Sequence, residues 1–258
     1  MRHAHQLPES PDPESAASLS HPPTTGTLDL VVAWYNEDLS WLATTAMPPH
    51  TLHIYAKHAG VHPDYSVVPL PNVGRETHTY MHHIVANYDS LADVTIFTQA
   101  GIDSPAYKGL KRKKLEHVLH ELPACRLRGM VCMAHHEPGL KIPFKPEFQI
   151  SHWTGTSPDN RAVTDGTDAL TPASVRPLAA WYRAFVDEDT SKIKRLGMSY
   201  NSIFAASAEA IRAHPRSLYE RIRDELAVSA HPEAGHYVER ILLSLFTFGV
   251  ARRTEPGK

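Results

Sequence analysis

Apolar positions form short runs and helical stripes that alternate along the chain from about residue 28 onward. The run LDLVVA (Leu28–Ala33) predicts a buried strand. Thr51–Lys57 and the shorter Ser66–Leu70 predict two more strands. Val94–Thr98 is rich in β-branched and aromatic residues, so it predicts a further, central strand.

The apolar period changes to that of a helix within Asn72–Tyr88. Met81, Ile84, Val85 and Tyr88 lie at i, i+3, i+4 and i+7, which places them on one face of an α-helix. Strands followed by a helix and another strand are typical of an alternating α/β domain. We therefore expect a mixed, mainly parallel sheet flanked by helices.

The second half of the chain is predicted to be mainly helical, with one long interruption. The segment from residue 137 to residue 173 is rich in Pro, Gly, Thr and Asp, which favours a loop. The predicted elements are a helix from Ser104 to Leu122, a helix over Val175–Val186, a strand over Ile203–Ala206, a helix over Ser207–Leu226 that restarts at Pro215, and a last helix over Glu233–Phe246.

Both ends of the chain lack this apolar pattern. Residues 1–27 are rich in Pro, Ser, Glu and His and cannot bury enough apolar surface to offset chain entropy, so we expect a disordered tail. Residues 251–258 are expected to form a second tail. Residues 28–250 then form a single α/β domain, which is long enough for a large core.

Composition narrows the range of functions. The formal net charge of the 258-residue chain is −2, which argues against a nucleic-acid partner, and no apolar run approaches the roughly 20 residues that cross a membrane. Two cysteines, Cys125 and Cys132, exclude a disulfide framework. We expect a soluble, cytoplasmic protein with a small-molecule substrate and no membrane partner, and its oligomeric state stays open. Histidine is frequent, with 18 copies, and imidazole serves both proton transfer and metal binding.

Polar residues follow the first and the central strand, where the ligand crevice of an open α/β sheet lies. Asn36 and Glu37 come directly after the first strand and offer hydrogen bonds to a sugar or a base. The alternative is a solvated turn with a capping acid. Gln99 ends the central strand as a neutral amide, and Asp103 comes four residues later, an arrangement that disfavours a divalent cation.

The segment PNVGRETH combines turn chemistry with the start of a helix. Asn72 and Gly74 favour a turn that leads into a helix N-terminus, which attracts anions, and Arg75 adds a fork for phosphate or carboxylate. His78 and His82 are four residues apart and share a helix face, as metal-binding histidine pairs do, although no HExxH accompanies them.

The last helix carries polar groups beside its core stripe. Glu233 lies at the helix entrance, and His236 and Glu239 lie together, turned away from the apolar stripe that includes Val238. Two acids and a histidine so placed can supply a general base and a cation ligand. The alternative is a capped helix with a salt bridge from Glu239 to a nearby arginine.

Five segments, VVAWYNEDLSWL, LPNVGRETHTYMHHIVANYDSLADVTIFTQ, WYRAFV, FAASAEAIRAHPRSLYERI and PEAGHYVER, cover most of residues 28–246. Together they resemble a family of uncharacterised proteins that is itself similar, remotely, to the GT-A glycosyltransferases. The resemblance implies a Rossmann-like sheet and a nucleotide-sugar site after the first strand. It also implies a metal-binding DxD after a central strand and a late helix with a catalytic acid.

Carried over by position, the resemblance places Asn36 and Glu37 near the nucleotide and Arg75 near the phosphates or the sugar. Glu233, His236 and Glu239 would lie beside the acceptor. The DxD position falls near Gln99, where both acids are missing, so Arg75 or Lys108 would have to neutralise the leaving phosphate.

We therefore expect a GT-A-like transferase that moves a sugar from a nucleotide-sugar donor to a small-molecule or natural-product acceptor. Glu239, Glu233 and Arg75 are its expected catalytic residues, and Asn36, Glu37, Asn72, Gln99 and Tyr237 its expected substrate contacts. Because a fold hosts many functions, two alternatives stay open. One is a metal-dependent enzyme in which His78, His82 and His236 hold one divalent ion (Mn, Mg or Zn), and the other is a non-catalytic binding domain of the same fold.

Overall fold

A mainly parallel, six-stranded sheet forms the centre of the protein, in a computed structural model that describes residues 26–150, 170–187, 189–190 and 193–254. The strand order is β3-β2-β1-β4-β8-β5. Strands β1 to β4 run parallel to one another, and β8 runs antiparallel to both β4 and β5. The strands are β1 (Leu28–Trp34), β2 (Thr51–Ala56), β3 (Val67–Pro69), β4 (Val94–Gln99), β5 (Met130–Val131) and β8 (Phe204–Ser207).

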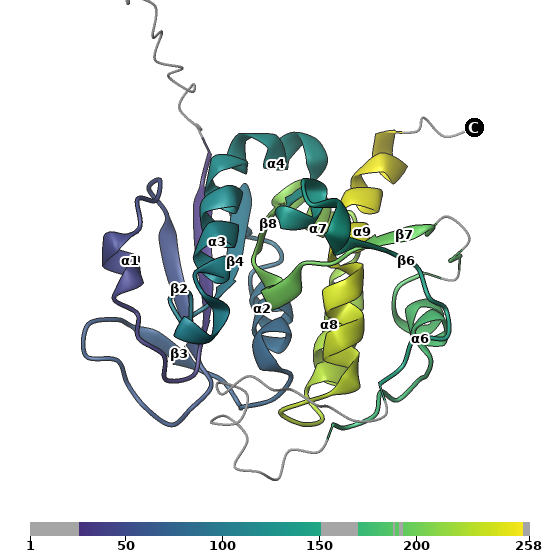
Figure 1. Cartoon of the computed structure of the whole chain (residues 1–258), viewed down its shortest axis with the longest axis horizontal. Coiled ribbons are helices and arrows are strands. Elements are labelled where there is room, and N and C mark those ends of the chain that lie inside the picture. Colours follow the sequence, from purple (N-terminus) through teal and green to yellow (C-terminus); the bar gives the residue numbers. More distant parts are fainter. Residues whose placement is uncertain (1–25, 151–169, 188, 191–192, 255–258) are drawn as a thin grey trace, which may run out of the picture.

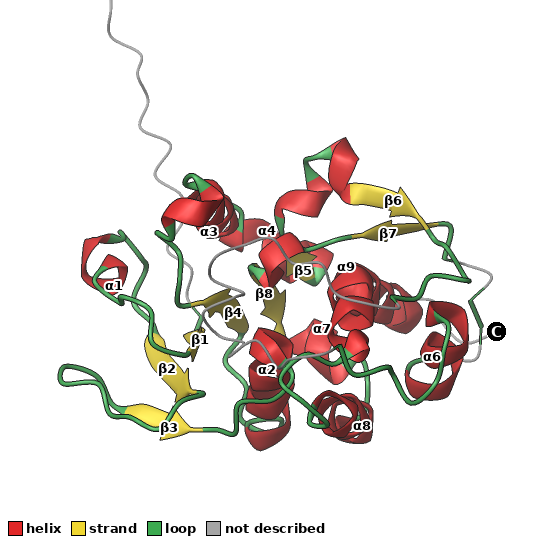
Figure 2. Cartoon of the chain, turned by 60° about the horizontal axis from the view of Figure 1, so that its bottom comes forward, coloured by secondary structure: helices red, strands yellow, loops and turns green. Residues whose placement is uncertain are grey.

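Helices cover both faces of this sheet (Figures 1 and 2). One layer contains α1 (Trp41–Thr44), α3 (Leu110–His120) and α4 (Leu122–Arg128). The other contains α2 (Arg75–Ala86), α7 (Ala208–Arg212), α8 (Arg216–Leu226) and the long α9 (Glu233–Thr254), with α6 (Leu178–Phe185) beside them. The expected α/β architecture, a mainly parallel sheet flanked by helices, is confirmed.

The alternation of side chains along the strands divides the core in two. In β1, Leu30 and Val32 face the layer of α3 and α4, whereas Val31 faces α2 and α9. All three are fully buried, as expected for a strand inside a parallel sheet that is covered on both faces.

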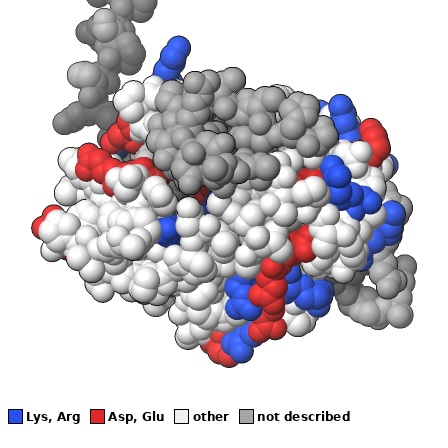
Figure 3. All heavy atoms as spheres, turned by 90° about the horizontal axis from the view of Figure 1, so that it is seen from below, with Lys and Arg blue, Asp and Glu red and all other residues white. Residues whose placement is uncertain are grey.

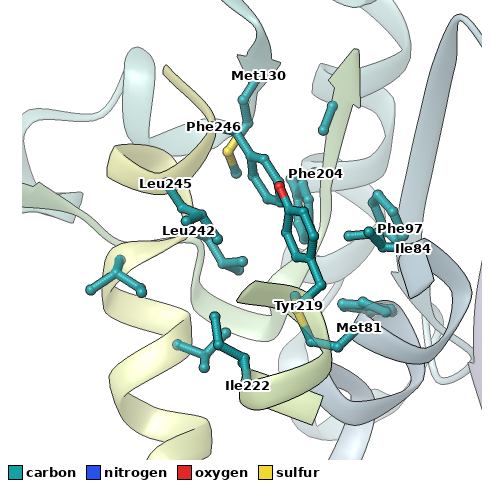
Figure 4. Packing of buried hydrophobic residues seen from close by; sticks show 14 of the residues in the cluster. Met81, Ile84, Phe97, Met130, Phe204, Tyr219, Ile222, Leu242, Leu245 and Phe246 are labelled. Atoms are coloured by element: carbon teal, nitrogen blue, oxygen red, sulfur yellow. The ribbon is translucent and has the colours of Figure 1, made fainter. Parts of the chain in front are cut away.

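Aromatic rings fill the half of the core that lies between the sheet and the layer of α2, α8 and α9 (Figure 4). Phe97 of β4 stacks on Phe204 of β8 with ring centroids 4.9 Å apart, and Phe204 stacks on Phe246 of α9 at 5.8 Å. Tyr219 of α8 lies 6.4 Å from Phe246. The stack joins the sheet to α9, so the position of this helix is fixed relative to the ends of the strands.

Some predicted boundaries change because local backbone geometry overrides the apolar pattern. The helix expected from Ser104 to Leu122 is divided into η1 (Pro105–Tyr107) and α3, and a separate helix, α4, begins at Leu122. Lys108 and Gly109 adopt left-handed conformations with φ of 46° and 76°, which ends one helical turn before α3 begins.

The long loop expected from residue 137 to residue 173 is only partly a loop. It contains η3 (Pro138–Leu140) and β6 (Lys141–Pro143), and β6 pairs with β7 (Arg195–Gly197) in a separate two-stranded sheet. A strand of three residues gives no periodic signal, and its partner is far away in sequence. Residues 151–169 of this segment lie outside the described residues.

The ends of the domain are partly described. Residues 1–25 of the expected N-terminal tail lie outside the described residues, whereas Thr27 already donates its N–H to the Asp93 carboxylate at 2.8 Å. At the other end, α9 continues through Thr254, so the helix includes the first residues of the expected C-terminal tail. Within the described residues, no helix combines the length and the hydrophobicity needed to cross a bilayer.

Candidate functional site

One cavity of about 740 Å³ lies at the carboxyl ends of β1, β2 and β4. The turn after β1, the start of α2, the segment after β4 and the first turns of α9 all contribute residues to its walls. A cavity of this volume is typical of small-molecule sites. Part of the end of the molecule on which it lies is visible in Figure 3, where both acidic and basic side chains of the described residues are exposed.

The topology explains why a crevice forms here. Within the sheet, β2 and β3 lie on one side of β1. The chain then returns through α2 to β4, which lies on the other side of β1. Connections that leave neighbouring parallel strands in opposite directions open a crevice at the carboxyl ends of those strands. The cavity lies at this switch point between β1 and β4.

The turn after β1 presents Asn36 and Glu37 to the cavity, as the sequence predicts. The Glu37 carboxylate accepts the backbone N–H groups of Tyr35 at 2.9 Å and of Asn36 at 3.2 Å. The Trp34 indole donates to the Glu37 carbonyl at 2.9 Å. Glu37 therefore shapes its own turn, and the turn holds Trp34, Tyr35 and Asn36 at the wall of the cavity.

Lys57 is a cavity residue that the sequence analysis missed. It directly follows β2, is 6% exposed, and donates an Nζ hydrogen to the Val73 carbonyl. Burial lowers the pKa of Lys57 to about 7, with an opposing effect from Glu76 and a smaller lowering effect from Arg75. The signal was present, because Lys57 is the first residue after β2, as Tyr35 is the first residue after β1 in the register of the two strands.

The start of α2 brings Asn72 and Arg75 to the cavity. Gly74 has φ of 60°, and a Cβ at this position would lie 2.7 Å from the Leu226 carbonyl oxygen, so glycine is required. Arg75 also has a positive φ, 49°, and its guanidinium lies 2.9 Å from the His231 ring. Non-glycine residues in this conformation are strained and concentrate at functional sites.

The end of β4 contributes Gln99 to the wall of the cavity, and the segment after β4 contributes Asp103. Arg112 binds the Asp103 carboxylate through two hydrogen bonds of 2.6 and 2.5 Å, and the first of the causes that lower the pKa of Asp103 is this pairing. Lys111 is 5% exposed and its Nζ lies 3.9 Å from the Tyr107 ring centroid. The wall is polar, but its acid is already paired.

Two of the predicted α9 residues, His236 and Glu239, line the same cavity as Asn36 and Arg75. Burial raises the pKa of Glu239 to about 7, with a further rise from Glu76. Burial also lowers the pKa of His236 to about 4, with Arg240 as the next cause. At neutral pH the cavity therefore holds a neutral imidazole and a carboxyl group close to its titration midpoint.

A short turn, η4 (Tyr200–Ser202), completes the wall next to α9. The N–H group of Asn201 donates to the Glu239 carboxylate at 3.1 Å. Asn201 and Ser202 both have left-handed backbone conformations, with φ of 65° and 49°. No sequence signal points to this turn, because such conformations are rare for residues other than glycine.

Glu233 and Tyr237, two further predictions on α9, do not line the cavity. Glu233 is fully buried, and its carboxylate accepts N–H groups of Ile150 at 2.7 Å and Ala173 at 3.0 Å and the Tyr237 hydroxyl at 2.8 Å. Arg176 completes the cluster with an Nε–Oε2 distance of 2.8 Å. Burial alone would raise the pKa of Glu233, but these contacts together lower it.

The predicted histidine site for a metal ion does not assemble. His78 and His82 stack with ring centroids 6.5 Å apart, and neither is among the residues that line the cavity with His236. Burial lowers the pKa of His78 to about 3, because its ring packs inside the protein at the first turn of α2. Throughout the described ranges, no group of three or more His, Cys, Asp or Glu side chains is arranged to hold a metal ion.

Comparison with known proteins gives one match. A family model described as a protein of unknown function, DUF3431, matches residues 30–254. No curated protein and no solved structure gives a significant match. The matched span includes each described wall of the cavity.

Proposed function

The chain belongs to the DUF3431 family of proteins of unknown function, and we propose that it is a transferase that moves a sugar from a nucleotide-sugar donor to an acceptor hydroxyl. The observation that carries the proposal is the shared cavity. It brings the end of β1, the start of α2 and the Glu239 carboxyl into one site of about 740 Å³.

The wall around the β1 and α2 ends suits a phosphorylated donor. Arg75 supplies positive charge beside the strand ends, and Lys57 adds to it when its amine is protonated. A guanidinium pairs with phosphate oxygens through two parallel hydrogen bonds. Trp34 and Tyr35 offer aromatic surface to a base, and Asn36 offers amide hydrogen bonds. These groups fit a ligand that combines a ring, phosphates and hydroxyls.

The wall formed by α9 suits the acceptor. Glu239 accepts a proton efficiently at neutral pH because its pKa is raised to about 7. In the proposed step, the acceptor oxygen forms a bond to the anomeric carbon and its proton passes to Glu239. The bond from that carbon to the phosphate oxygen breaks, and its electron pair leaves with the nucleoside diphosphate, which Arg75 stabilises.

We propose that cationic side chains, and not a divalent ion, neutralise the leaving group in this step. The carboxylates nearest to the strand ends are already engaged, Glu37 by its own turn and Asp103 by Arg112, and Gln99 is an amide. In addition, the described side chains form no cluster suited to a metal ion. The cationic side chains therefore carry the charge neutralisation in the proposal.

A ligand panel tests the proposal. Purified protein is heated with nucleoside diphosphates, with their sugar conjugates and with free sugars, and the melting temperature is compared. We expect the conjugates at saturating concentration to raise the melting temperature by about 3 °C or more, and free sugars to leave it unchanged. No rise with any nucleotide-containing ligand would contradict the proposal.

A turnover assay separates transfer from binding alone. Release of nucleoside diphosphate from a bound conjugate is measured for the native protein and for Glu239→Gln, with Lys113→Met as the control. Lys113 is exposed on α3, outside the cavity wall, so its replacement should leave release unchanged. Tight binding of a conjugate without release, with every acceptor supplied, would favour the non-catalytic binding domain.

A further inference from the structure

A buried lysine on α3 holds the turn that contacts Glu239. Lys114 is 3% exposed, although its neighbour Lys113 on the same basic helix is exposed. Burying an ammonium group is unfavourable unless its hydrogens are satisfied. The Lys114 Nζ donates to the Tyr200 carbonyl at 2.6 Å and to the Asn201 side-chain oxygen at 3.2 Å. Both acceptors belong to η4.

The η4 turn needs such support. Asn201 and Ser202 are consecutive non-glycine residues with positive φ, and each such residue is strained by about 1 kcal/mol or more. Strained conformations persist only when their surroundings hold them in place. Besides Lys114, the turn is held by the N–H group of Ser202, which donates to the Ser199 carbonyl at 2.6 Å.

The other side of the turn faces the cavity. The N–H of Asn201 donates to the Glu239 carboxylate at 3.1 Å, and Tyr200, Asn201 and Ser202 all line the cavity. A chain of contacts therefore runs from Lys114 through η4 to the proposed base. It connects a helix on one face of the sheet to a helix on the other.

We propose that Lys114 is a positioning residue that fixes the Tyr200–Ser202 turn and, through the Asn201 amide, sets the orientation and the charge state of Glu239. The inference rests on the proposed function only for the role of Glu239 as a base. The contacts themselves are independent of the reaction, so the inference can be tested without a substrate.

The charges around Glu239 give the sign of the expected effect. Burial and Glu76 of α2 raise the pKa of Glu239, whereas Arg240 of α9, the Asn201 N–H and Lys114 of α3 lower it. The pKa of Lys114 itself is lowered by burial and raised by Glu239 and Glu137. Replacing Lys114 by methionine removes one lowering influence directly and, through η4, a second. The pKa of Glu239 should therefore rise.

The test measures the Glu239 carboxyl directly. Protein labelled with ¹³C at the glutamate side-chain carboxyl is titrated by NMR, and Glu239→Gln assigns the signal. In Lys114→Met we expect the pKa to rise by about one unit, a roughly tenfold fall in the ratio of ionised to protonated carboxyl at a given pH. Lys113→Met, from the same helix, removes an equal charge without the contacts and should shift the pKa far less.

A second variant keeps the inference falsifiable if Lys114→Met does not fold. Asn201→Gly retains the backbone N–H and tolerates positive φ, but it removes the side-chain acceptor of Lys114. A rise in the pKa of Glu239 in this variant supports the inference. An unchanged pKa in folded Lys114→Met or in Asn201→Gly would overturn it. A shifted pKa in a protein that binds no nucleotide would reject only the proposed function.

Discussion

Two glutamates on α9 look alike in the sequence and differ completely in the structure. Glu233 and Glu239 are six residues apart, which separates them by about 9 Å along the helix and by about 120° around it. Both were predicted to be catalytic. Glu233 faces a closed cluster of Ile150, Ala173, Arg176 and Tyr237, whereas Glu239 faces the cavity.

The surroundings move the two carboxyl groups in opposite directions. Two N–H groups, a hydroxyl and a guanidinium stabilise the charge of Glu233, so its pKa is lowered despite full burial. Glu239 has one backbone N–H donor, and burial raises its pKa to about 7. A satisfied carboxylate stabilises the fold, and an incompletely satisfied one is available for proton transfer.

The largest expected effect is on turnover by Glu239→Gln. If the carboxyl is the general base, release of nucleoside diphosphate should fall by about 10²–10⁴-fold. The amide keeps the size of the side chain, so the far-UV circular dichroism spectrum should not change. Native-like turnover in this variant would remove the distinction between the two acids.

The second effect is on stability and belongs to Glu233. Glu233→Gln removes the buried negative charge that pairs with Arg176 and leaves the guanidinium without its counter-ion. The free energy of unfolding should therefore fall by about 3 kcal/mol. Urea denaturation measures this change. Tyr237→Phe removes a single hydrogen bond of the same cluster and should lower it by about 1 kcal/mol. A Glu233→Gln protein as stable as the native one would show that the cluster does not hold α9.

The pH dependence of stability should have opposite signs at the two sites. The folded pKa of Glu239, about 7, lies above its ordinary value of 4.5, so the folded state retains a proton that the unfolded chain loses. Native protein should therefore lose stability relative to Glu239→Gln as pH rises from about 4.5 to 7, by an amount on the order of 2 kcal/mol.

The pKa of Glu233 is lowered in the folded state. The ionised carboxylate therefore contributes its full stabilisation of the fold at pH values above the ordinary pKa of glutamate. This stabilisation is lost as the pH falls through the folded-state pKa. Glu233→Gln should thus be less destabilising at pH 3 than at pH 7. Thermal unfolding from pH 3 to pH 8 measures both differences. Parallel curves for the two variants would contradict the assignment of opposite shifts.

The smallest effect concerns ligand binding by Arg75. Arg75→Lys keeps the charge and the positive φ strain but loses the two-pronged fork. The affinity for a nucleoside diphosphate, measured by calorimetry, should fall about tenfold. Arg221→Lys on the exposed side of α8 is the matched control and should bind normally. Equal affinities for the two variants would assign Arg75 to its contact with His231.

Local periodicity determined much of this fold. Val238, Ile241, Leu242 and Leu245 are buried as their spacing predicts, and the same spacing placed His236 and Glu239 together on the cavity side. Asn36, Arg75 and Gln99 lie at one cavity, as expected from their positions near strand ends, because parallel strands end at the same edge of a sheet. These features follow from residues close together in the chain.

Only the tertiary structure decided what each polar group does. The partners of Glu233 at Ile150 and Ala173 lie 83 and 60 residues away, so no local pattern reveals that its carboxylate is occupied. In the sequence, Lys114 looks like one of several exposed lysines of a basic helix. In the structure it donates a hydrogen bond to η4, which comes 86 residues later in the chain. The charge state of a side chain depends on burial and on neighbours from other elements, and both are set by packing across the whole chain.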